Sequence, residues 1–348
     1  MVPPHKPLLT VLSGTPVWPP PVWLMRQAGR YLPEYRQIRA EVPDFVSLCL
    51  DSRRATEVTL QPIRRFGFDA AILFSDILIL PWALGYELAF KEGEGPVLPK
   101  LRTADQVSGL DLDAVVSRTA PIAETVHRVR SGLESEGFSH TALIGFAGSP
   151  FTVACYMVEG GGSRDFAAVR QMAYSDPELF AGLIDVLADG TVAYLSAQIE
   201  AGAEAVMLFD SWAGLLSPSL FMRHVVRPTA QIVGRLRERH PRIPIIGFPR
   251  LAGQMLGRYA AHTGVQAVGT DTGMDLAVAS ALAGADVALQ GNLDPMALVA
   301  GGAALREEAA TILTAVRGKR HIFNLGHGIV PQTPVSHVAA LTEQIRGA

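Results

Sequence analysis

Cysteine is scarce in this chain, which has 2 cysteines among its 348 residues. Cys49 and Cys155 lie far apart in the sequence, and each is surrounded by apolar residues. This rules out a disulfide framework and indicates a protein of a reducing compartment. We therefore expect a cytoplasmic protein.

The chain also has little net charge. With 30 Lys and Arg against 33 Asp and Glu, the net charge is -3. Such a balance gives no general attraction to nucleic acid or to an anionic membrane surface, so any anion-binding site must be local. The 9 histidines form no His-Glu-x-x-His pattern and the cysteines form no Cys-x-x-Cys pattern. We expect no bound metal.

Long uninterrupted apolar runs are missing as well. The longest apolar stretch, from Ala70 to Phe90, is broken by Asp76, Pro81 and Gly85. A membrane span would not carry these residues, so we expect a strand followed by a loop. The proline-rich start does not resemble a signal peptide.

Short apolar runs alternate with longer amphipathic segments along most of the chain. This alternation predicts parallel strands joined by helices. Eight such strands would close an α/β fold of the (β/α)8 TIM type. The predicted strands are Val22 to Met25, Ala70 to Phe74, Ala142 to Phe146, Ala205 to Phe209, Ile243 to Gly247, Ala267 to Gly269, Val287 to Gln290 and His321 to Asn324.

The whole chain, residues 1–348, is expected to form one barrel domain. Residues 1–20 would be a proline-rich arm, and residues 86–110 an excursion between the second and third strands with a small hairpin, before a helix near Leu112. A capping residue before proline predicts helix starts at the following pairs: Asp176-Pro177, Ser217-Pro218, Asp294-Pro295 and Thr333-Pro334.

Polar residues follow nearly every predicted strand. In barrels of this type the carboxyl ends of the strands carry the active site. Turn and cap residues account for some of these positions, but hardly for all of them. In chain order the residues are Arg26, Asp76, Gly148-Ser149, Asp210-Ser211, Arg250, Asp271, Asn292 and His327.

The segment from Pro21 to Arg36 carries Arg26, Arg30 and Arg36 around Gly29 and Pro33. Charge alone favours a solvated basic loop. If residues 26 to 30 form a helical turn, Arg26 and Arg30 share one face and can hold two anionic groups of one ligand.

Four further residues are candidates for chemistry, each with a structural alternative. Asp76 is an acid in an apolar context that either caps a turn or stabilises a cation. Tyr156 is either a core aromatic residue or a ligand contact. Ser211 lacks a nucleophile elbow, so a hydrogen bond to a ligand suits it better. His327 stands between two glycines, which allow close approach of a ligand.

The glycine run from Gly160 to Gly162 has neither the Walker spacing nor the dinucleotide fingerprint. We expect it to form a flexible loop or a lid.

Several of these segments together resemble the uroporphyrinogen decarboxylase family, in order and through nearly the whole chain. Two departures are visible: Cys155 stands where a small hydroxyl residue is common, and Thr272 follows Asp271 where the family often has Trp. The segments are Arg26 to Arg36, Phe74 to Asp76, Gly148 to Gly160, Asp210 to Gly214, Gln290 to Pro295 and Asn324 to Ile329.

The resemblance implies a homodimeric barrel enzyme that converts uroporphyrinogen III to coproporphyrinogen III and needs no metal or organic cofactor. It implies catalytic roles for Asp76, Arg26 and Tyr156. The substrate-binding residues that it implies are Arg26, Gln27, Ala28, Gly29, Arg30, Asp76, Tyr156, Ser211 and His327.

The chemistry of the substrate agrees with these assignments. A macrocycle with eight carboxylates suits arginine, whose forked donors match carboxylate geometry. Protonation of a pyrrole carbon makes a cationic ring that accepts the electrons when carbon dioxide leaves, and Asp76 would stabilise that cation. Arg26 would clamp a carboxylate and take part in proton delivery, whereas Arg36 would hold the loop in place.

Two alternatives stay open. One is a zinc-dependent corrinoid or thiol methyltransferase of the same superfamily, which should show a His-x-Cys-like pair at a strand end. The fifth predicted strand ends instead in Gly247-Phe-Pro-Arg250. The other is a non-catalytic tetrapyrrole-binding protein, which would keep the arginines without needing Asp76.

Overall fold

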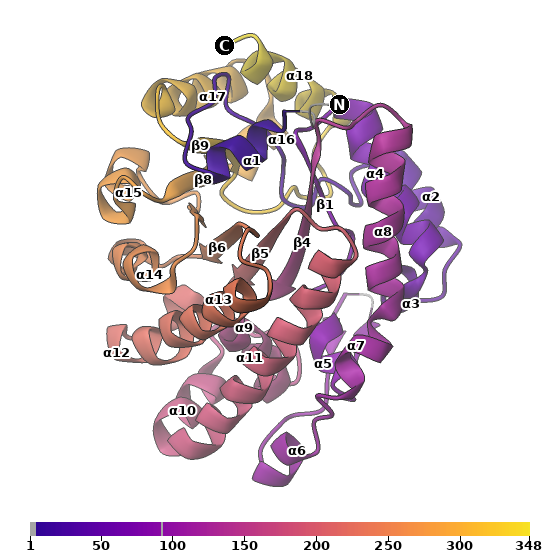
Figure 1. The fold of residues 1–348 in the computed structure, drawn as a ribbon, viewed down its shortest axis with the longest axis vertical. Helices are drawn as coiled ribbons and strands as arrows, with labels where there is room; N and C mark the ends of the chain where they lie inside the picture. The colour runs from indigo at the N-terminus through magenta and orange to yellow at the C-terminus, as the bar shows by residue number, and fades with distance from the viewer. Residues whose placement is uncertain (1–4, 92) are drawn as a thin grey trace.

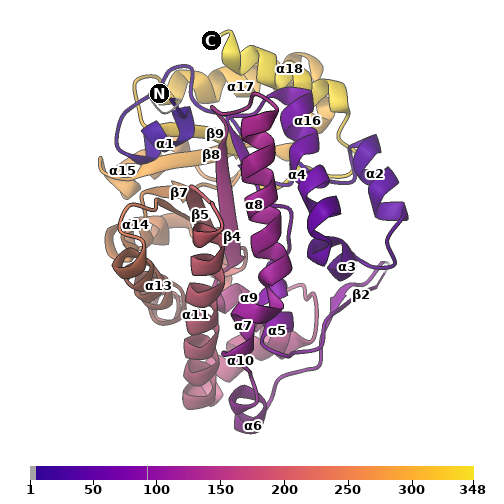
Figure 2. The ribbon, with the colours of Figure 1, turned by 45° about the vertical axis from the view of Figure 1, so that its right-hand side comes forward.

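Seven parallel strands form the central sheet of the structure, a computed structural model that describes residues 5–91 and 93–348. The strands follow the order β1-β4-β5-β6-β7-β8-β9, and the sheet curls on itself with helices on its outer face (Figures 1 and 2). This is the predicted TIM-type α/β class. The strands are β1 Ala70–Ile72, β4 Ala142–Gly148, β5 Ala205–Asp210, β6 Ile245–Pro249, β7 Ala267–Gly269, β8 Ala288–Leu293 and β9 His321–Leu325.

The first predicted strand, Val22 to Met25, is not a strand. Only Val22 forms a bridge, which is isolated and parallel, with Phe323 of β9. The preceding prolines carry no N–H to donate, so a regular ladder cannot extend in that direction. Beyond Leu24 the chain turns away into a loop.

Backbone hydrogen bonds nevertheless join this short segment to both edges of the sheet. Toward β9, the Trp23 N–H donates to the Phe323 carbonyl at 3.3 Å and the Phe323 N–H donates to the Pro21 carbonyl at 2.8 Å. Toward β1, the Asp69 N–H donates to the Val22 carbonyl at 2.9 Å, and the Val22 N–H donates to Asp69 Oδ2 at 2.8 Å. The segment therefore takes the eighth position of the barrel.

Helices of very different length cover the sheet. In Figure 2, α4, α8 and α11 run side by side along its outer face. The main helices are α1 Pro7–Leu12, α2 Pro33–Ala40, α3 Phe45–Leu50, α4 Ser52–Phe66, α5 Ile79–Ala83, α7 Ala114–Arg118, α8 Ala120–Ser135, α9 Pro150–Glu159, α10 Ala167–Ser175, α11 Pro177–Glu200, α12 Pro218–Phe221, α13 Arg227–Arg239, α14 Leu256–Thr263, α15 Leu276–Ala283, α16 Pro295–Ala300, α17 Gly302–Val316 and α18 Val335–Arg346.

The predicted helix starts hold, with one displaced by a residue. The carboxylates of Asp176 and Asp294 accept backbone N–H groups at the starts of α11 and α16, and α12 begins at Pro218. At the last predicted start, Pro334 is itself the N-cap, and α18 begins at Val335.

A hairpin occurs in the predicted excursion. Strands β2 (Ala89–Lys91) and β3 (Gly95–Val97) pair antiparallel, and the short helix α6 (Ala104–Ser108) follows before α7. An isolated bridge joins Val97 to Gly161, and a Cβ on Gly161 would lie 2.7 Å from the Pro96 carbonyl oxygen. Gly161 therefore packs against the hairpin, whereas nothing lies within 4 Å of a Cβ on Gly162, and the flexible loop or lid stays a prediction.

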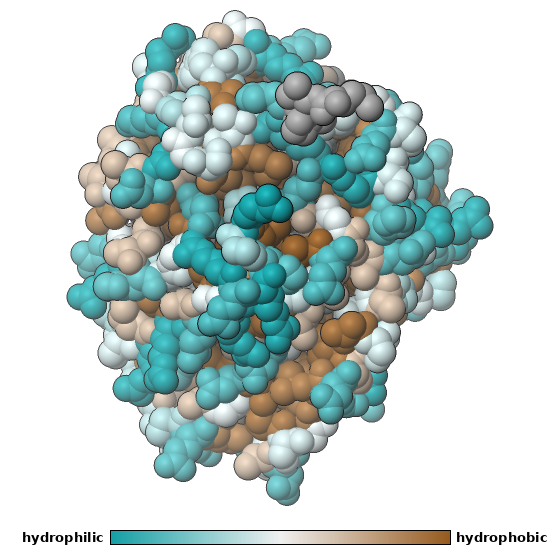
Figure 3. Space-filling view, in the orientation of Figure 1, coloured by the Kyte–Doolittle hydropathy of each residue, from teal (hydrophilic) through white to brown (hydrophobic). Residues whose placement is uncertain are grey.

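Helix α11 is the one helix of the described residues that is long and apolar enough to span a membrane by length and composition. It packs against β4, α9 and α13, and 61% of its most apolar window is buried inside the fold. Figure 3 shows a hydrophobic patch in the lower half of this face, but none of the exposed large hydrophobic residues of the described chain lies on α11. The apolar composition of α11 is therefore that of a helix packed in the core.

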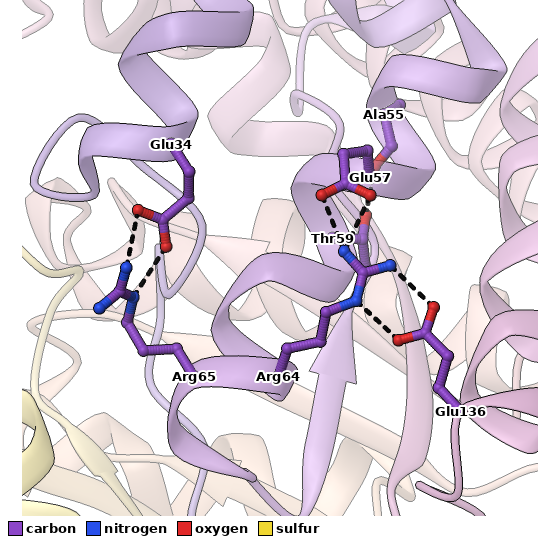
Figure 4. A network of polar contacts seen from close by, with 7 residues as sticks. All are labelled: Glu34, Ala55, Glu57, Thr59, Arg64, Arg65 and Glu136. Carbon is purple, nitrogen blue, oxygen red and sulfur yellow. Dashed lines mark hydrogen bonds and ion pairs between the residues drawn. The ribbon is translucent and has the colours of Figure 1, made fainter.

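Ion pairs on the outer surface connect α4 to its neighbours (Figure 4). Arg64 donates to Glu57 and to Glu136, which follows α8, while Arg65 donates to Glu34 of α2. These side chains are substantially exposed, so each pair contributes little to stability.

A more buried ionic network lies at the amino ends of β4 and β5. Glu204 Oε2 accepts hydrogen bonds from Lys6 Nζ at 2.6 Å and from the Leu143 N–H at 3.1 Å, and it forms an ion pair with the Arg130 guanidinium at 2.7 Å. The Lys6 side chain is 7% exposed and also donates to the Thr141 carbonyl at 2.9 Å. The network fastens the N-terminal arm to the barrel.

We predict that Glu204→Gln lowers the free energy of unfolding by about 3 kcal/mol, because it leaves the Lys6 ammonium buried without its anion. The matched control is Glu124→Gln, which removes the exposed partner of Arg128 and should cost less than about 0.5 kcal/mol. Urea unfolding measures both. Equal small losses would show that the buried network contributes no more than a surface pair.

Candidate active site

The loop after Val22 turns sharply at Arg26, whose φ of 60° is left-handed. The Gln27 N–H closes the turn on the Leu24 carbonyl at 2.9 Å. The Met25 N–H donates to Asn324 Oδ1 at 2.9 Å, which fastens the loop to the end of β9. No helical turn forms between residues 26 and 30, so the expected shared helical face of Arg26 and Arg30 is wrong.

The rest of this loop exposes backbone donors. Among the described residues, the N–H groups of Ala28, Gly29 and Arg30 donate no hydrogen bond. The Gln27 side chain is fully buried and bonds within the protein, to the Leu24 N–H and the Ala70 carbonyl. The loop can thus offer an anion its arginines and its N–H groups, but not the Gln27 amide.

Arg36 holds this loop, as the sequence predicts. Its guanidinium donates to the Arg30 carbonyl at 2.8 Å and to the Tyr31 carbonyl at 3.2 Å. The side chains of Arg26 and Arg30 form no hydrogen bond or ion pair among the described residues, and both are exposed.

Two glycines let the loop after β9 carry His327 close to its neighbours. A Cβ on Gly326 would lie 2.2 Å from the Thr272 nitrogen, and a Cβ on Gly328 would lie 2.4 Å from Arg26 Cδ. Burial lowers the pKa of His327 to about 4, with further lowering by the charges of Arg26 and Arg250. His327 is therefore a neutral imidazole at pH 7.

Asp76 follows β1 in a loop with fixed backbone. The Phe74 N–H donates to the Thr59 hydroxyl at 3.0 Å, and the Leu78 N–H donates to Asp76 Oδ1 at 2.8 Å. The other carboxylate oxygen forms no hydrogen bond among the described residues. Burial raises the pKa of Asp76, while the Leu78 N–H and the charge of Arg26 favour the ionised form.

An aromatic wall stands beside these charges. The Tyr156 ring on α9 lies 5.7 Å from the Phe166 ring and 6.5 Å from the Trp212 ring, measured between centroids. Phe166 and Trp212 are 4.6 Å apart. Burial raises the pKa of Tyr156, so its hydroxyl stays protonated and able to donate. The buried indole N–H of Trp212 has no acceptor among the described residues.

Asp210 at the end of β5 connects the elements that carry this aromatic wall. Its Oδ1 accepts the Thr152 hydroxyl at 2.6 Å, and the Thr152 oxygen accepts the Trp212 backbone N–H at 3.1 Å. Thr152 lies one helical turn before Tyr156 on α9. Ser211, which is half-buried, lies in the loop that this bond holds. Burial raises the pKa of Asp210 to about 7.

The structure thus places all the predicted positions around one end of the barrel, with the Gln27 side chain turned inward. The strand-end pattern also marks two residues that lie here outside the predicted catalytic and binding set: Asp210, which supports the wall, and Arg250, whose charge lowers the pKa of His327. No group of three or more His, Cys, Asp or Glu side chains able to hold a metal occurs in residues 5–91 and 93–348.

Comparison with known proteins matches residues 3–348 to the family model described as uroporphyrinogen decarboxylase (URO-D). A curated relative of that name from Granulibacter bethesdensis is 60% identical over 342 residues, which cover 98% of this chain and 99% of the relative. One from Acidiphilium cryptum is 58% identical, with 98% and 94% covered.

Solved structures share the fold. A methyltransferase from Methanosarcina mazei superimposes with a TM-score of 0.75 over 97% of this chain and 96% of its own, at 19% sequence identity. A B12-independent methionine synthase from a Shewanella strain gives a TM-score of 0.55 at 9% identity, with 100% of this chain and 98% of its own covered. At these identities the likeness concerns the fold alone.

The raised pKa of Asp210 predicts a pH-dependent effect of Asp210→Asn. Between about pH 4 and pH 7 the unfolded chain releases the Asp210 proton while the folded chain keeps it, so this group makes the wild type less stable as the pH rises. The stability of Asp210→Asn relative to the wild type should therefore increase across this window.

Urea unfolding at pH 4.5, 6 and 7.5 measures this difference. The exposed Asp286, changed to Asn, serves as the control and should follow the wild type at each pH. A difference for Asp210→Asn that stays constant or falls with pH would contradict a protonated Asp210.

Proposed function

The chain belongs to the uroporphyrinogen decarboxylase family, and we propose that its cleft converts uroporphyrinogen III to coproporphyrinogen III as a carboxy-lyase. Four acetate side chains become methyl groups in this reaction. Each step consumes one proton and releases one carbon dioxide. The observation that carries the proposal is the Asp76 carboxylate, which follows β1 at the carboxyl end of the barrel, with one oxygen accepting the Leu78 N–H and the other forming no hydrogen bond among the described residues.

The substrate itself provides the electron sink. Protonation of a pyrrole carbon makes the ring cationic, the bond to the carboxylate breaks, and its electron pair moves into the ring as carbon dioxide leaves. A second proton transfer to the resulting methylene, with return of the first ring proton, leaves a methyl group. Asp76, aimed at pyrrole N–H groups, stabilises the cation more strongly in a desolvated cleft than it would in water.

The remaining residues hold the macrocycle. Arg26 and Arg30 bind its carboxylates, helped by the unpartnered N–H groups of Ala28 and Gly29. Tyr156 and Ser211 orient acetate or propionate groups, and His327 does so as a neutral imidazole. The charge of Arg26 acts to lower the pKa of Asp76, and this interaction supports a part for Arg26 in proton delivery.

The methyltransferase alternative has only the shared fold in its favour. The end of β6 reads Gly247-Phe-Pro-Arg250 and offers no His-x-Cys-like pair. Anaerobic incubation with uroporphyrinogen III distinguishes a decarboxylase from the alternative functions. Formation of coproporphyrinogen would support the decarboxylase, whereas binding without product would support a non-catalytic tetrapyrrole carrier. Stoichiometric zinc in the purified protein would support the methyltransferase alternative.

We propose that the enzyme acts as a cytoplasmic homodimer. Both cysteines, Cys49 and Cys155, are buried free thiols, which suits a reducing compartment. The dimer rests on the family resemblance, and light scattering on the purified protein at several concentrations tests it.

We predict that Asp76→Asn lowers kcat about 100-fold or more and leaves KM within about threefold, because the charge acts on the transition state and not on the bound substrate. Asp275→Asn is the matched control, since Asp275 also accepts backbone N–H groups through one oxygen, but at the exposed start of α15. Product is measured anaerobically, with uroporphyrin binding as a check. Retained turnover with substrate bound would overturn the electrostatic role.

Gly328→Ala should raise KM about tenfold, because the added methyl displaces the Arg26 side chain without removing its charge. Gly234→Ala on α13, where nothing lies within 4 Å of the added Cβ, should leave KM unchanged. An unchanged KM in Gly328→Ala would show that the position of the Arg26 stem does not matter for binding.

A further inference from the structure

Arg250 follows β6 and is half-buried, yet its guanidinium has neither a hydrogen bond nor an ion pair among the described residues. Every other half-buried arginine of residues 5–91 and 93–348 has a partner. These are Arg39 with the Val42 carbonyl, Arg54 with Asp51, Arg130 with Glu204, Arg170 with Asp165, Arg235 with Asp189, Arg237 with the Gly264 carbonyl and Arg320 with the Ala285 carbonyl.

The backbone around Arg250 is fixed from three sides. The Arg250 N–H donates to the Asp210 carbonyl at 3.1 Å, and the Gly214 N–H donates to the Arg250 carbonyl at 3.1 Å. The next residue, Leu251, is held in a left-handed conformation with φ of 59°, and its N–H donates to Asp271 Oδ2 at 2.8 Å. A strained and well-anchored backbone of this kind is typical of a functional side chain.

The nearest acid does not neutralise Arg250. Asp271 is the acid whose charge acts on it, but no Asp271 oxygen lies within ion-pair distance of the guanidinium. Both carboxylate oxygens already accept backbone N–H groups, Oδ2 from Leu251 and Oδ1 from Gly273 at 3.1 Å. Asp271 therefore holds the backbone and leaves the guanidinium free.

The barrel order puts Arg250 on the opposite side of the barrel's carboxyl end from Arg26. The Val22 segment, which leads to Arg26, takes the position between β9 and β1, and β6 is the fourth strand beyond it in either direction. The two guanidiniums repel each other, and burial with the charge of Arg26 lowers the pKa of Arg250. Such an arrangement is unfavourable until an anion enters between the two side chains.

We propose that Arg250 binds a carboxylate of the substrate on the wall opposite Arg26, as a second anchor for the macrocycle. The assignment rests on the proposed function for the identity of the substrate. The planar guanidinium matches a carboxylate with two parallel hydrogen bonds, which lysine cannot make. Because this carboxylate stays bound before and during the reaction, Arg250 contributes to affinity and not to the chemical step.

Titration with uroporphyrin, the oxidised macrocycle that has the same carboxylates and does not react, tests the proposal by fluorescence. We expect Arg250→Gln to weaken binding by about 10- to 100-fold and Arg250→Lys to lie between it and the wild type. Arg258→Gln on α14, which removes an exposed arginine without a partner, is the matched control and should bind as the wild type does.

Two further measurements sharpen the test. Coproporphyrin, which lacks the acetates, separates the two sources of the carboxylate: a similar loss of its affinity in Arg250→Gln assigns the contact to a propionate, and no loss assigns it to an acetate. In the free protein, Arg250→Gln should raise the pKa of His327, because it removes one of the charges that lower it. This NMR readout does not depend on the substrate.

The outcomes separate this inference from the proposed function. If the wild type forms no coproporphyrinogen but binds uroporphyrin through Arg250, the decarboxylase assignment fails and the anion site stands. If the wild type is active while Arg250→Gln keeps its uroporphyrin affinity and KM, the Arg250 assignment fails. Circular dichroism of each variant establishes that it is folded.

Discussion

The closure of the barrel by one short backbone segment is the constraint on which the site depends. Val22 and its neighbours hydrogen-bond to Phe323 on one side and to Asp69 on the other. These bonds bring together three loops from distant parts of the sequence, which carry Arg26, Asp76 and His327. Because the segment contributes a single bridge and not a full strand, the chain is free to turn immediately and to place Arg26 over the cleft.

The carboxyl end of the barrel carries a set of incompletely paired charges. Arg26 and Arg250 lack anionic partners among the described residues, and Asp76 has one oxygen that accepts no hydrogen bond. Among the described residues, the non-glycine residues with left-handed φ are Arg26, Phe166 and Leu251, all of which border this region. Both features cost stability, and both are what a pre-organised site for a polyanionic ligand requires.

The barrel class and the starts of most strands could be predicted from the sequence, because apolar periodicity and proline caps are local signals. Closure at Val22 could not, since it depends on which distant edges a proline-flanked segment meets. Arg26 was found from its motif, but its left-handed turn was not, because arginine gives no sign of that conformation. The contact between Gly161 and the hairpin could not be predicted either, because glycine allows close packing as readily as it allows freedom.

The roles of the supporting residues have weaker sequence signals than the roles that the family resemblance implies. The role of Asp210 depends on Thr152, which lies on another element, and the isolation of Arg250 depends on Asp271 having both oxygens occupied. Neither fact has a sequence signature. Each role depends on the hydrogen bonds of neighbouring groups that lie far away in the sequence.

Stability and catalysis depend on opposite ends of the barrel, as the ionic network of Lys6, Arg130 and Glu204 shows. It lies at the amino ends of β4 and β5, whereas the cleft lies at the carboxyl ends of the strands. Substitutions that strengthen this network should therefore raise thermal stability with little effect on kcat or KM, because they lie away from the strand ends that carry the site. A barrel that is more stable at its amino end would also tolerate more destabilising substitutions at the site, including those that fit macrocycles with other side chains.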